Sequence, residues 1–359
     1  MIDWQQVADL SNIGAISGRE AAIVDYVKQH LPFCRYRQDR LGSGLFSLGQ
    51  GELSLMVATH MDEIGFIVSE IDATGYLRIQ PVGSVWTHTL LQQRVYVQTV
   101  KGQRYLAIIG GPAVHSLTPS ERLTTVVPPE QLYLDLGVES RTEVQALGIQ
   151  VGDQVTLATE FAELNNRDYV VGKAFDNRIS VAIGMALMRS LQTQALTKQV
   201  TLATTVQEEV GIRGARTSTS LLQPDVAFAL DTAVAGDTPA NRNSLKLGGG
   251  VALNVIDSMT VTHRGLLRFL EQLCEKYQIP YQYSCFVDGG TDAGNIHKIG
   301  TGVLATTLSI PIRYMHTHQS IIHKQDVAAT LRLLQMAIEE MTPEVYQMIL
   351  EQNYRFTLK

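Results

Sequence analysis

The apolar positions along the chain follow two spacings, one typical of helices and one typical of buried strands. Residues 53–59 form a short, continuously apolar run, which predicts a strand covered on both faces. Residues 21–27 carry apolar side chains at helical spacing, and Ser17 and Glu20 stand at the separation of a capping box. We therefore expect the first 35 residues to be helical and a buried strand to follow.

Strands and helices alternate again after Val170. The predicted strands are 200–206, 225–230 and 302–308, and the predicted helices are 179–191, 266–277 and 325–341. This alternation is typical of an α/β fold with three layers, in which helices cover both faces of a mostly parallel central sheet.

Between about residues 67 and 163, the pattern of apolar residues differs from that of the flanking parts. Short β-prone runs alternate there with glycine-containing turns, at 75–79, 94–100, 105–109 and 154–157. Several strands at this spacing predict a small β-barrel or sandwich. We therefore expect a discontinuous α/β domain of residues 1–66 and 164–359, interrupted by an inserted β-rich domain of residues 67–163.

The amino-acid composition limits the binding partners and the cellular compartment that we expect for the protein. The 359 residues carry a formal net charge of −6 without a basic run, which argues against nucleic-acid binding. Three widely spaced cysteines suit a reducing compartment, and we find neither a signal-like start nor an apolar stretch of about 20 residues. We expect a cytoplasmic protein without membrane contact. Only 18% of residues are charged, so we expect subunit contacts to cover part of the surface.

Acidic and histidine side chains gather where the predicted strands end. They are His60, Asp62, Glu208, Glu209, Asp231 and His316, joined by Asp176 just before a predicted helix. Ligand sites of open α/β sheets lie outside the carboxyl ends of the strands, so we expect these side chains to share one edge. Two histidines and three carboxylates suit Zn²⁺, Co²⁺ or Mn²⁺, and five ligands suit two ions that share a bridging carboxylate. Considered alone, Asp176 also fits a helix N-cap.

Two short segments add further candidates. Of the adjacent Glu208 and Glu209, we expect one carboxylate to bind a metal and the other to accept a proton from metal-bound water. The loop at 289–292 is rich in glycine but lacks the lysine and the spacing of a phosphate-binding loop. We expect Gly290 and Thr291 to approach the substrate closely, and Asp292 to contact its amine.

Six segments together resemble the glutamyl-aminopeptidase family of dinuclear metallo-aminopeptidases, which includes the tetrahedral aminopeptidases and relatives once labelled cellulases. In chain order they read THMDEIGF (59–66), GKAFDNR (172–178), VQEEVG (206–211), ALD (229–231), GGTDAG (289–294) and YMH (314–316). The resemblance implies an α/β peptidase domain with an inserted β-barrel-like dimerisation domain, and peptide substrates with a free N-terminus. It also implies a homo-oligomer in which dimers assemble into a dodecamer.

The resemblance also implies roles for individual residues. Two divalent ions, zinc or cobalt with manganese as a further candidate, would be bound by His60, Asp176, Glu209, Asp231 and His316. Asp176 would bridge both ions, and the division of the other ligands between them is left open. Glu208 would be the general base that takes a proton from the metal-bridging water, and Asp62 would orient His60.

The chain departs from the family after His316, where many relatives read Ser-Pro-x-Glu and this chain reads THQS over 317–320. For His318 and His323 we expect surface positions rather than places in the pocket. A metal-dependent amidohydrolase or deacetylase, a non-catalytic oligomeric assembly protein and a metal-independent glycosidase are the alternative functions. The preferred N-terminal residue, the native metal and the assembly size stay open.

Overall fold

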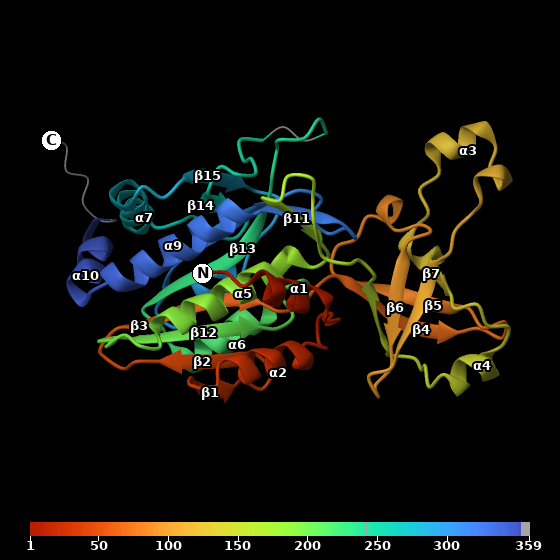
Figure 1. Cartoon of the computed structure of the whole chain (residues 1–359), viewed down its shortest axis with the longest axis horizontal. Helices are drawn as coiled ribbons and strands as arrows, with labels where there is room; N and C mark the ends of the chain where they lie inside the picture. The colour runs from red at the N-terminus through yellow and green to blue at the C-terminus, as the bar shows by residue number, and fades with distance from the viewer. Residues whose placement is uncertain (241–242, 353–359) are drawn as a thin grey trace.

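A central eight-stranded sheet organises the larger part of the computed structural model, which describes residues 1–240 and 243–352 (Figure 1). In order across the sheet, the strands are β1 (Arg35–Gln38), β2 (Gly44–Leu48), β12 (Gln199–Thr205), β3 (Ser54–His60), β13 (Val226–Val234), β16 (Leu304–Ile312), β14 (Val251–Asp257) and β15 (Tyr281–Phe286). The pairs β12–β3, β3–β13, β13–β16 and β14–β15 are parallel, so the predicted mostly parallel sheet is confirmed.

Helices cover both faces of this sheet, so the predicted three-layer α/β fold is also confirmed. Apolar side chains of one layer come from α1 (Trp4–Asn12), α2 (Ala21–His30), α5 (Phe175–Leu191), α7 (Arg264–Tyr277), α9 (Lys324–Glu340) and α10 (Pro343–Gln352). Those of the other layer come from α6 (Arg213–Leu222) and α8 (Ala293–Ile296). Successive residues of β3 alternate between the two, because side chains of a strand point to opposite faces: Leu55 and Val57 face the first layer, and Met56 and Ala58 face the second.

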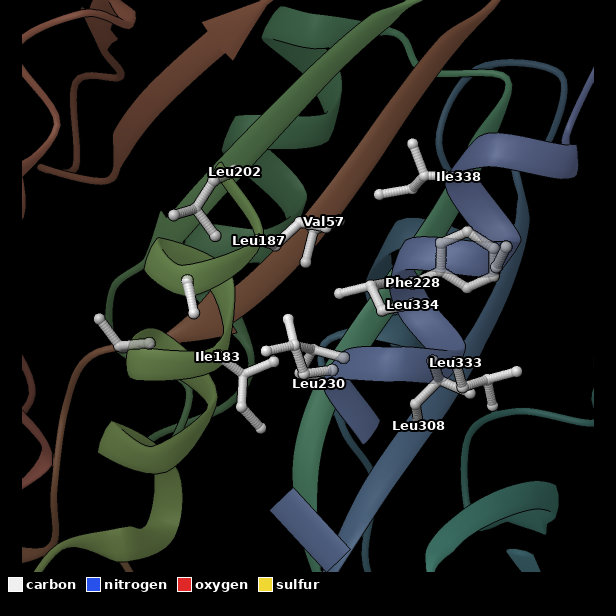
Figure 2. Close-up of a cluster of buried hydrophobic side chains, with 14 of the residues drawn as sticks. Val57, Ile183, Leu187, Leu202, Phe228, Leu230, Leu308, Leu333, Leu334 and Ile338 are labelled. Carbon is white, nitrogen blue, oxygen red and sulfur yellow. The ribbon is translucent and has the colours of Figure 1, made fainter. Parts of the chain in front are cut away.

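The larger core lies between the sheet and the helices α5 and α9. Figure 2 shows Ile183 and Leu187 of α5 and Leu334 of α9 beside Val57 and Leu230 of the central strands. All five side chains are almost completely buried. This packing holds α5 and α9 against the central strands β3 and β13.

The N-terminal region differs from the expected single helical stretch. Helix α1 ends at Asn12 and α2 begins at Ala21. The predicted capping box is wrong, because the Ser17 hydroxyl donates to Asp62 at 2.6 Å and no side chain caps α2. The segment between the two helices is instead tied to the end of the central sheet.

The second unit is a closed six-stranded barrel, seen on the right of Figure 1. Around the barrel the strands are β4 (Gly65–Ile71), β5 (Leu77–Val82), β8 (Tyr133–Asp135), β7 (Arg104–Ile109), β6 (Arg94–Gln98) and β9 (Gln154–Leu157), all paired antiparallel. Closure removes the exposed edges that an open sheet would present. The barrel has its own apolar core, in which Phe66, Val95 and Leu134 are fully buried.

The remaining elements are short. A three-stranded sheet is formed by β10 (Ala162–Glu163), β11 (Tyr169–Gly172) and β17 (Ser320–His323). The others are α3 (Pro119–Thr124), α4 (Arg141–Ala146) and the 3-10 turns η1 (Thr87–Thr89), η2 (Val114–Ser116) and η3 (Pro129–Gln131). Within the two described ranges, we find no helix whose length and apolar character would let it cross a bilayer.

Replacing the fully buried Leu187 with alanine is expected to lower the free energy of unfolding by about 2–5 kcal/mol, because the change removes apolar contacts and leaves a cavity. The matched control is Leu221→Ala on α6, where the leucine is 39% exposed and the loss should be much smaller. Denaturant unfolding followed by circular dichroism measures both. Equal losses would contradict the packing in Figure 2.

Candidate metal centre

Three neighbouring strands and one helix bring the predicted ligand residues together. His60 is the last residue of β3, and its register partner on β12 is Thr205, shortly before Glu208. Asp231 lies on β13, which pairs with β3 on the other side. It stands inside this strand rather than at its end, which corrects the predicted strand bounds. Asp176 is the second residue of α5, where the backbone dihedral angles are still non-helical.

The Asp176 carboxylate lies between two groups of candidate ligand atoms. Its Oδ1 is 3.2 Å from His60 Nε2, which is also 3.8 Å from Asp231 Oδ1. Its Oδ2 is 3.3 Å from His316 Nε2, which is 3.3 Å from Glu209 Oε1. Within each group the ligand atoms lie within 4.8 Å of one another. The structure therefore brings the five predicted ligands into two adjacent groups that share Asp176.

Burial and mutual repulsion determine the electrostatics of this cluster. Burial raises the pKa of Glu208 well above its ordinary value; the charge of His60 opposes the shift, and nearby carboxylates add to it. Burial also acts to raise the pKa of Asp176, but hydrogen bonds from His316 and His60 outweigh it and lower that pKa. Burial acts to lower the pKa of His316, but its hydrogen bonds with carboxylates raise it to about 11. In the described part of the chain, no ion pair joins a Lys or Arg to these carboxylates.

Asp62 holds both the histidine and the paired glutamates. The Nδ1 of His60 lies 3.2 Å from the Asp62 carbonyl oxygen and 3.5 Å from its carboxylate, which leaves Nε2 facing the cluster. The Asp62 carboxylate accepts hydrogen bonds from the backbone N–H groups of Glu208 and Glu209, each at 3.0 Å. From the sequence we predicted only the contact between Asp62 and His60. The backbone contacts explain how two adjacent glutamates are held at one edge of the sheet.

A buried ion-pair network behind the cluster was missed in the sequence. Lys173 Nζ donates to both carboxylate oxygens of Glu63, at 2.7 and 2.8 Å, and Arg178 lies 3.4 Å from the same carboxylate. Arg178 also donates to backbone carbonyls of the N-terminal segment, those of Leu10 and Ala15 among them. Burial lowers the pKa of Lys173 to about 8, although Glu63 opposes this shift. The only signal in the sequence was the position of these charges within the motifs that carry His60 and Asp176.

The barrel contributes directly to the site. His316 Nδ1 lies 3.0 Å from the carbonyl oxygen of Ser84, in the segment that follows β5. The neighbouring Gly83 has a φ of +82°, and a Cβ there would meet Ile64 at 2.7 Å and Glu209 at 3.3 Å. A glycine is therefore required for the barrel segment to approach this closely.

The surface positions expected for His318 and His323 are wrong. His318 is 3% exposed, and its Nε2 lies 3.0 Å from the Arg94 carbonyl oxygen of barrel strand β6. His323 is also buried, and its Nδ1 accepts the backbone N–H of Gln325 at 3.1 Å as the N-cap of α9. The partner of His318 lies far away in the sequence, and that of His323 lies in the first turn of the next helix. No spacing in the sequence indicates either contact.

The cluster lines a cleft of about 450 Å³. Its other walls come from β13, β14, β15 and β16, from residues 288–291 and from Met315. Gly290 and Thr291 line the cleft, and their contact with a substrate stays a prediction. Asp292 is 2% exposed and accepts the Thr205 hydroxyl at 2.5 Å, and burial raises its pKa to about 7. Its contact with a substrate amine stays a prediction.

Known aminopeptidases are similar to this chain over nearly its whole length. A family model described as M42 glutamyl aminopeptidase matches residues 42–333. The putative aminopeptidase FrvX of Escherichia coli K12 is 35% identical over 347 residues, which cover 95% of each chain. A TET aminopeptidase from Thaumarchaeota archaeon SCGC AB-539-E09 superposes with a TM-score of 0.92, at 33% identity over 96% of this chain and 98% of that one. The Pyrococcus horikoshii TET1 peptidase, which can assemble into a tetrahedron or a large octahedral shell, has a TM-score of 0.86 at 29% identity, covering 94% and 99%.

The fold of this chain, a three-layer α/β unit with a closed barrel, is therefore shared over nearly its whole length with a class of aminopeptidases. The chain belongs to the M42 family of glutamyl aminopeptidases, so the resemblance stated from its motifs is confirmed. M42 peptidases are metallopeptidases, and the chain is a hydrolase that acts on peptide bonds. The alternative of a non-catalytic assembly protein therefore has no support.

Asp62→Asn is expected to lower the free energy of unfolding by about 1–3 kcal/mol, because an amide N–H₂ would face the backbone N–H of Glu208 or Glu209. The exposed Asp135→Asn on β8 serves as the control and should change stability little. Denaturant unfolding measures both variants under identical buffer conditions. A wild-type stability for Asp62→Asn would show that its carboxylate does not hold the two glutamates.

Proposed function

We propose that this chain is an aminopeptidase that uses two divalent metal ions to remove N-terminal residues from peptides. The observation that carries the proposal is the position of Asp176, whose two carboxylate oxygens face two different groups of candidate ligands. We assign one ion to His60, Asp176 and Asp231, and the other to Asp176, Glu209 and His316.

The donor set fits divalent ions of borderline hardness. Imidazole nitrogens and carboxylate oxygens suit Zn²⁺ and Co²⁺ best, and Mn²⁺ is also compatible. Among the described residues, the buried Glu209 Oε1 has no partner besides His316 Nε2 at 3.3 Å, and a cation would satisfy it. When bound, the ions supply Lewis-acid chemistry, polarising the peptide carbonyl and making a water molecule more acidic.

Glu208 is the proposed general base. Its side chain lines the cleft beside the ligand residues, and Asp62 fixes its backbone N–H. The Glu208 carboxylate accepts a proton from the water that attacks the carbonyl carbon of the first peptide bond. As the C–N bond breaks, the same side chain delivers that proton to the leaving amine.

The barrel is the proposed dimerisation domain, with the bounds 67–163. Several large apolar side chains are exposed on it, and exposed apolar surface favours contact with another subunit. Residues 110–132 connect β7 to β8 and carry α3; we call this segment the arm. The exposed apolar side chains of the barrel and the arm include Leu106, Ile108, Val114, Leu123 and Val126. We propose that dimers formed through this surface assemble into a dodecamer, as the tetrahedral form of the similar TET1 peptidase suggests. A cytoplasmic location fits the three free cysteines.

Light scattering of the purified protein is expected to give a mass far above the 39.6 kDa of one chain. Leu123→Asp, at a leucine 88% exposed on the arm, should shift the population toward smaller species, because it places a charge in an apolar contact. The control is Val261→Asp, at a valine 76% exposed on the α/β unit. A monomeric wild-type protein would contradict the proposed assembly.

Glu208→Gln is expected to lower kcat for aminoacyl anilides by at least about 100-fold, because the amide cannot accept the proton, while metal content stays unchanged. Elemental analysis and a steady-state assay measure the two quantities. Glu143→Gln on α4, an exposed position, is the matched control.

Retained turnover in Glu208→Gln would remove Glu208 from the mechanism. The same assay run with N-acetyl amino acids separates the alternatives. Faster hydrolysis of those amides than of aminoacyl anilides would favour the amidohydrolase over the aminopeptidase.

A further inference from the structure

The wall of the cleft opposite the metal ligands is built from two paired strands. Across the sheet, Asp231 on β13 is the register partner of Ser309 on β16, and Ser309 is the partner of Ala252 on β14. The wall is two to three strands away from β13 across the sheet, and its residues line the same cleft as the metal ligands. Asp257 ends β14 and its register partner Phe286 ends β15.

The Asp257 carboxylate is held in a fixed position. It is 8% exposed, and its Oδ1 accepts the backbone N–H groups of Met259 and Thr260 at 2.8 and 2.7 Å. Within the two described ranges, its Oδ2 accepts only the Asn254 side-chain amide, at 2.9 Å, and keeps a free lone pair. Because Asp257 lines the cleft, this lone pair is a place for a further donor.

A second carboxylate, Asp288, lies on the same wall and is exposed. The next residue, Gly289, accepts the backbone N–H of Ser258 at 3.0 Å, which ties the Asp288 loop to the Asp257 turn. Among the described residues, neither carboxylate forms an ion pair, and the cleft lining contains no Lys or Arg. We call this surface, made by Asn254, Asp257, Ser284, Phe286 and Asp288, the acidic wall.

The charge of the acidic wall is not needed to balance the metal ions. The four other carboxylates of the cleft are Asp176, Glu208, Glu209 and Asp231. Two divalent ions carry a total charge equal and opposite to that of these four groups. The two negative charges of the acidic wall therefore remain for a substrate.

We propose that the acidic wall binds a cationic N-terminal side chain, so that the preferred substrates are peptides beginning with lysine or arginine. This inference rests on the proposed aminopeptidase function. The acidic wall and the metal ligands line one cleft, so the side chain of a residue whose carbonyl lies at the ligands extends into the space that the wall borders, and lysine and arginine present a cation at the end of a long stem. Val234, Phe286 and Met315 line the cleft and offer apolar surface to the aliphatic stem of such a side chain.

Other N-terminal residues fit this wall less well. A glutamate would bring a third negative charge to two carboxylates without a cation, and would be repelled. A leucine side chain has no hydrogen-bond donor, so it would leave the free lone pair of Asp257 unsatisfied and that carboxylate partly desolvated. The acidic wall therefore selects by charge and by hydrogen bonding.

The test compares kcat/KM of the metal-loaded full-length enzyme for anilides of lysine, arginine, norleucine, leucine and glutamate. Norleucine has the lysine stem without the ammonium group, so the ratio of lysine to norleucine isolates the charge. We expect a ratio of about ten or more, which corresponds to roughly 1.4 kcal/mol, and the slowest turnover for glutamate. Asp257→Asn should reduce the ratio about tenfold and change norleucine turnover less than about twofold.

Asp25→Asn, on the exposed face of α2, removes the same charge away from the cleft and should leave the ratio unchanged. Because Asp257 is buried, the exposed Asp288→Asn provides a second variant that should also lower the ratio. A wild-type enzyme that prefers norleucine, leucine or glutamate would overturn the inference while leaving the aminopeptidase function intact. Equal losses for lysine and norleucine in both wall variants would overturn it too. Failure to cleave any aminoacyl substrate would overturn the proposed function and this inference together.

Discussion

The rest of the structure depends on one constraint, which is the burial of several carboxylates at one edge of the central sheet. The side chains of Asp176, Glu209 and Asp231 are nearly removed from water and Glu208 is half-buried, and no lysine or arginine of the described ranges pairs with them. Buried charge is costly unless an opposite charge accompanies it. His60 and His316 supply part of the compensation, and the arrangement of four ligand side chains around Asp176 offers places for two cations. The positive side chains nearest in the sequence, Lys173 and Arg178, are instead committed to Glu63.

The fold meets this constraint by combining distant segments. Parallel register places the ends of β3 and β12 side by side, and β13 adds Asp231 from the opposite neighbour. Arg178 fastens the start of α5 to the N-terminal segment, and the Asp62 carboxylate fastens the paired glutamates. The barrel completes the arrangement, since Ser84 and Arg94 accept hydrogen bonds from the loop that carries His316. The barrel is thus part of the active-site framework as well as the proposed contact between subunits.

Much of this could be predicted from the sequence, because the strand ends and the motifs are local. A short apolar run followed by His60 indicates both the strand and the sheet edge, and the six motifs in order indicate the family. The misses share a physical reason. Ser17 stands at capping-box spacing, yet its hydroxyl donates to Asp62. His318 looks polar and solvent-facing, yet its partner is a carbonyl oxygen of the barrel. In each case the decisive partner lies far along the chain, so spacing carries no information about it. The acidic wall was missed for a related reason, because Asp257 and Asp288 meet only through the pairing of β14 with β15 and the loop that follows.

The central claim is that Asp176 bridges two metal ions held by this chain. Calorimetric titration of metal-free protein with Zn²⁺ tests it most directly, because the stoichiometry counts the ions without reference to turnover. The account predicts two ions per chain for the wild type, and weakened binding at both positions in Asp176→Ala, since its carboxylate belongs to both ligand groups. A stoichiometry of one or none in the folded wild-type protein, or two sites of unchanged affinity in Asp176→Ala, would contradict it.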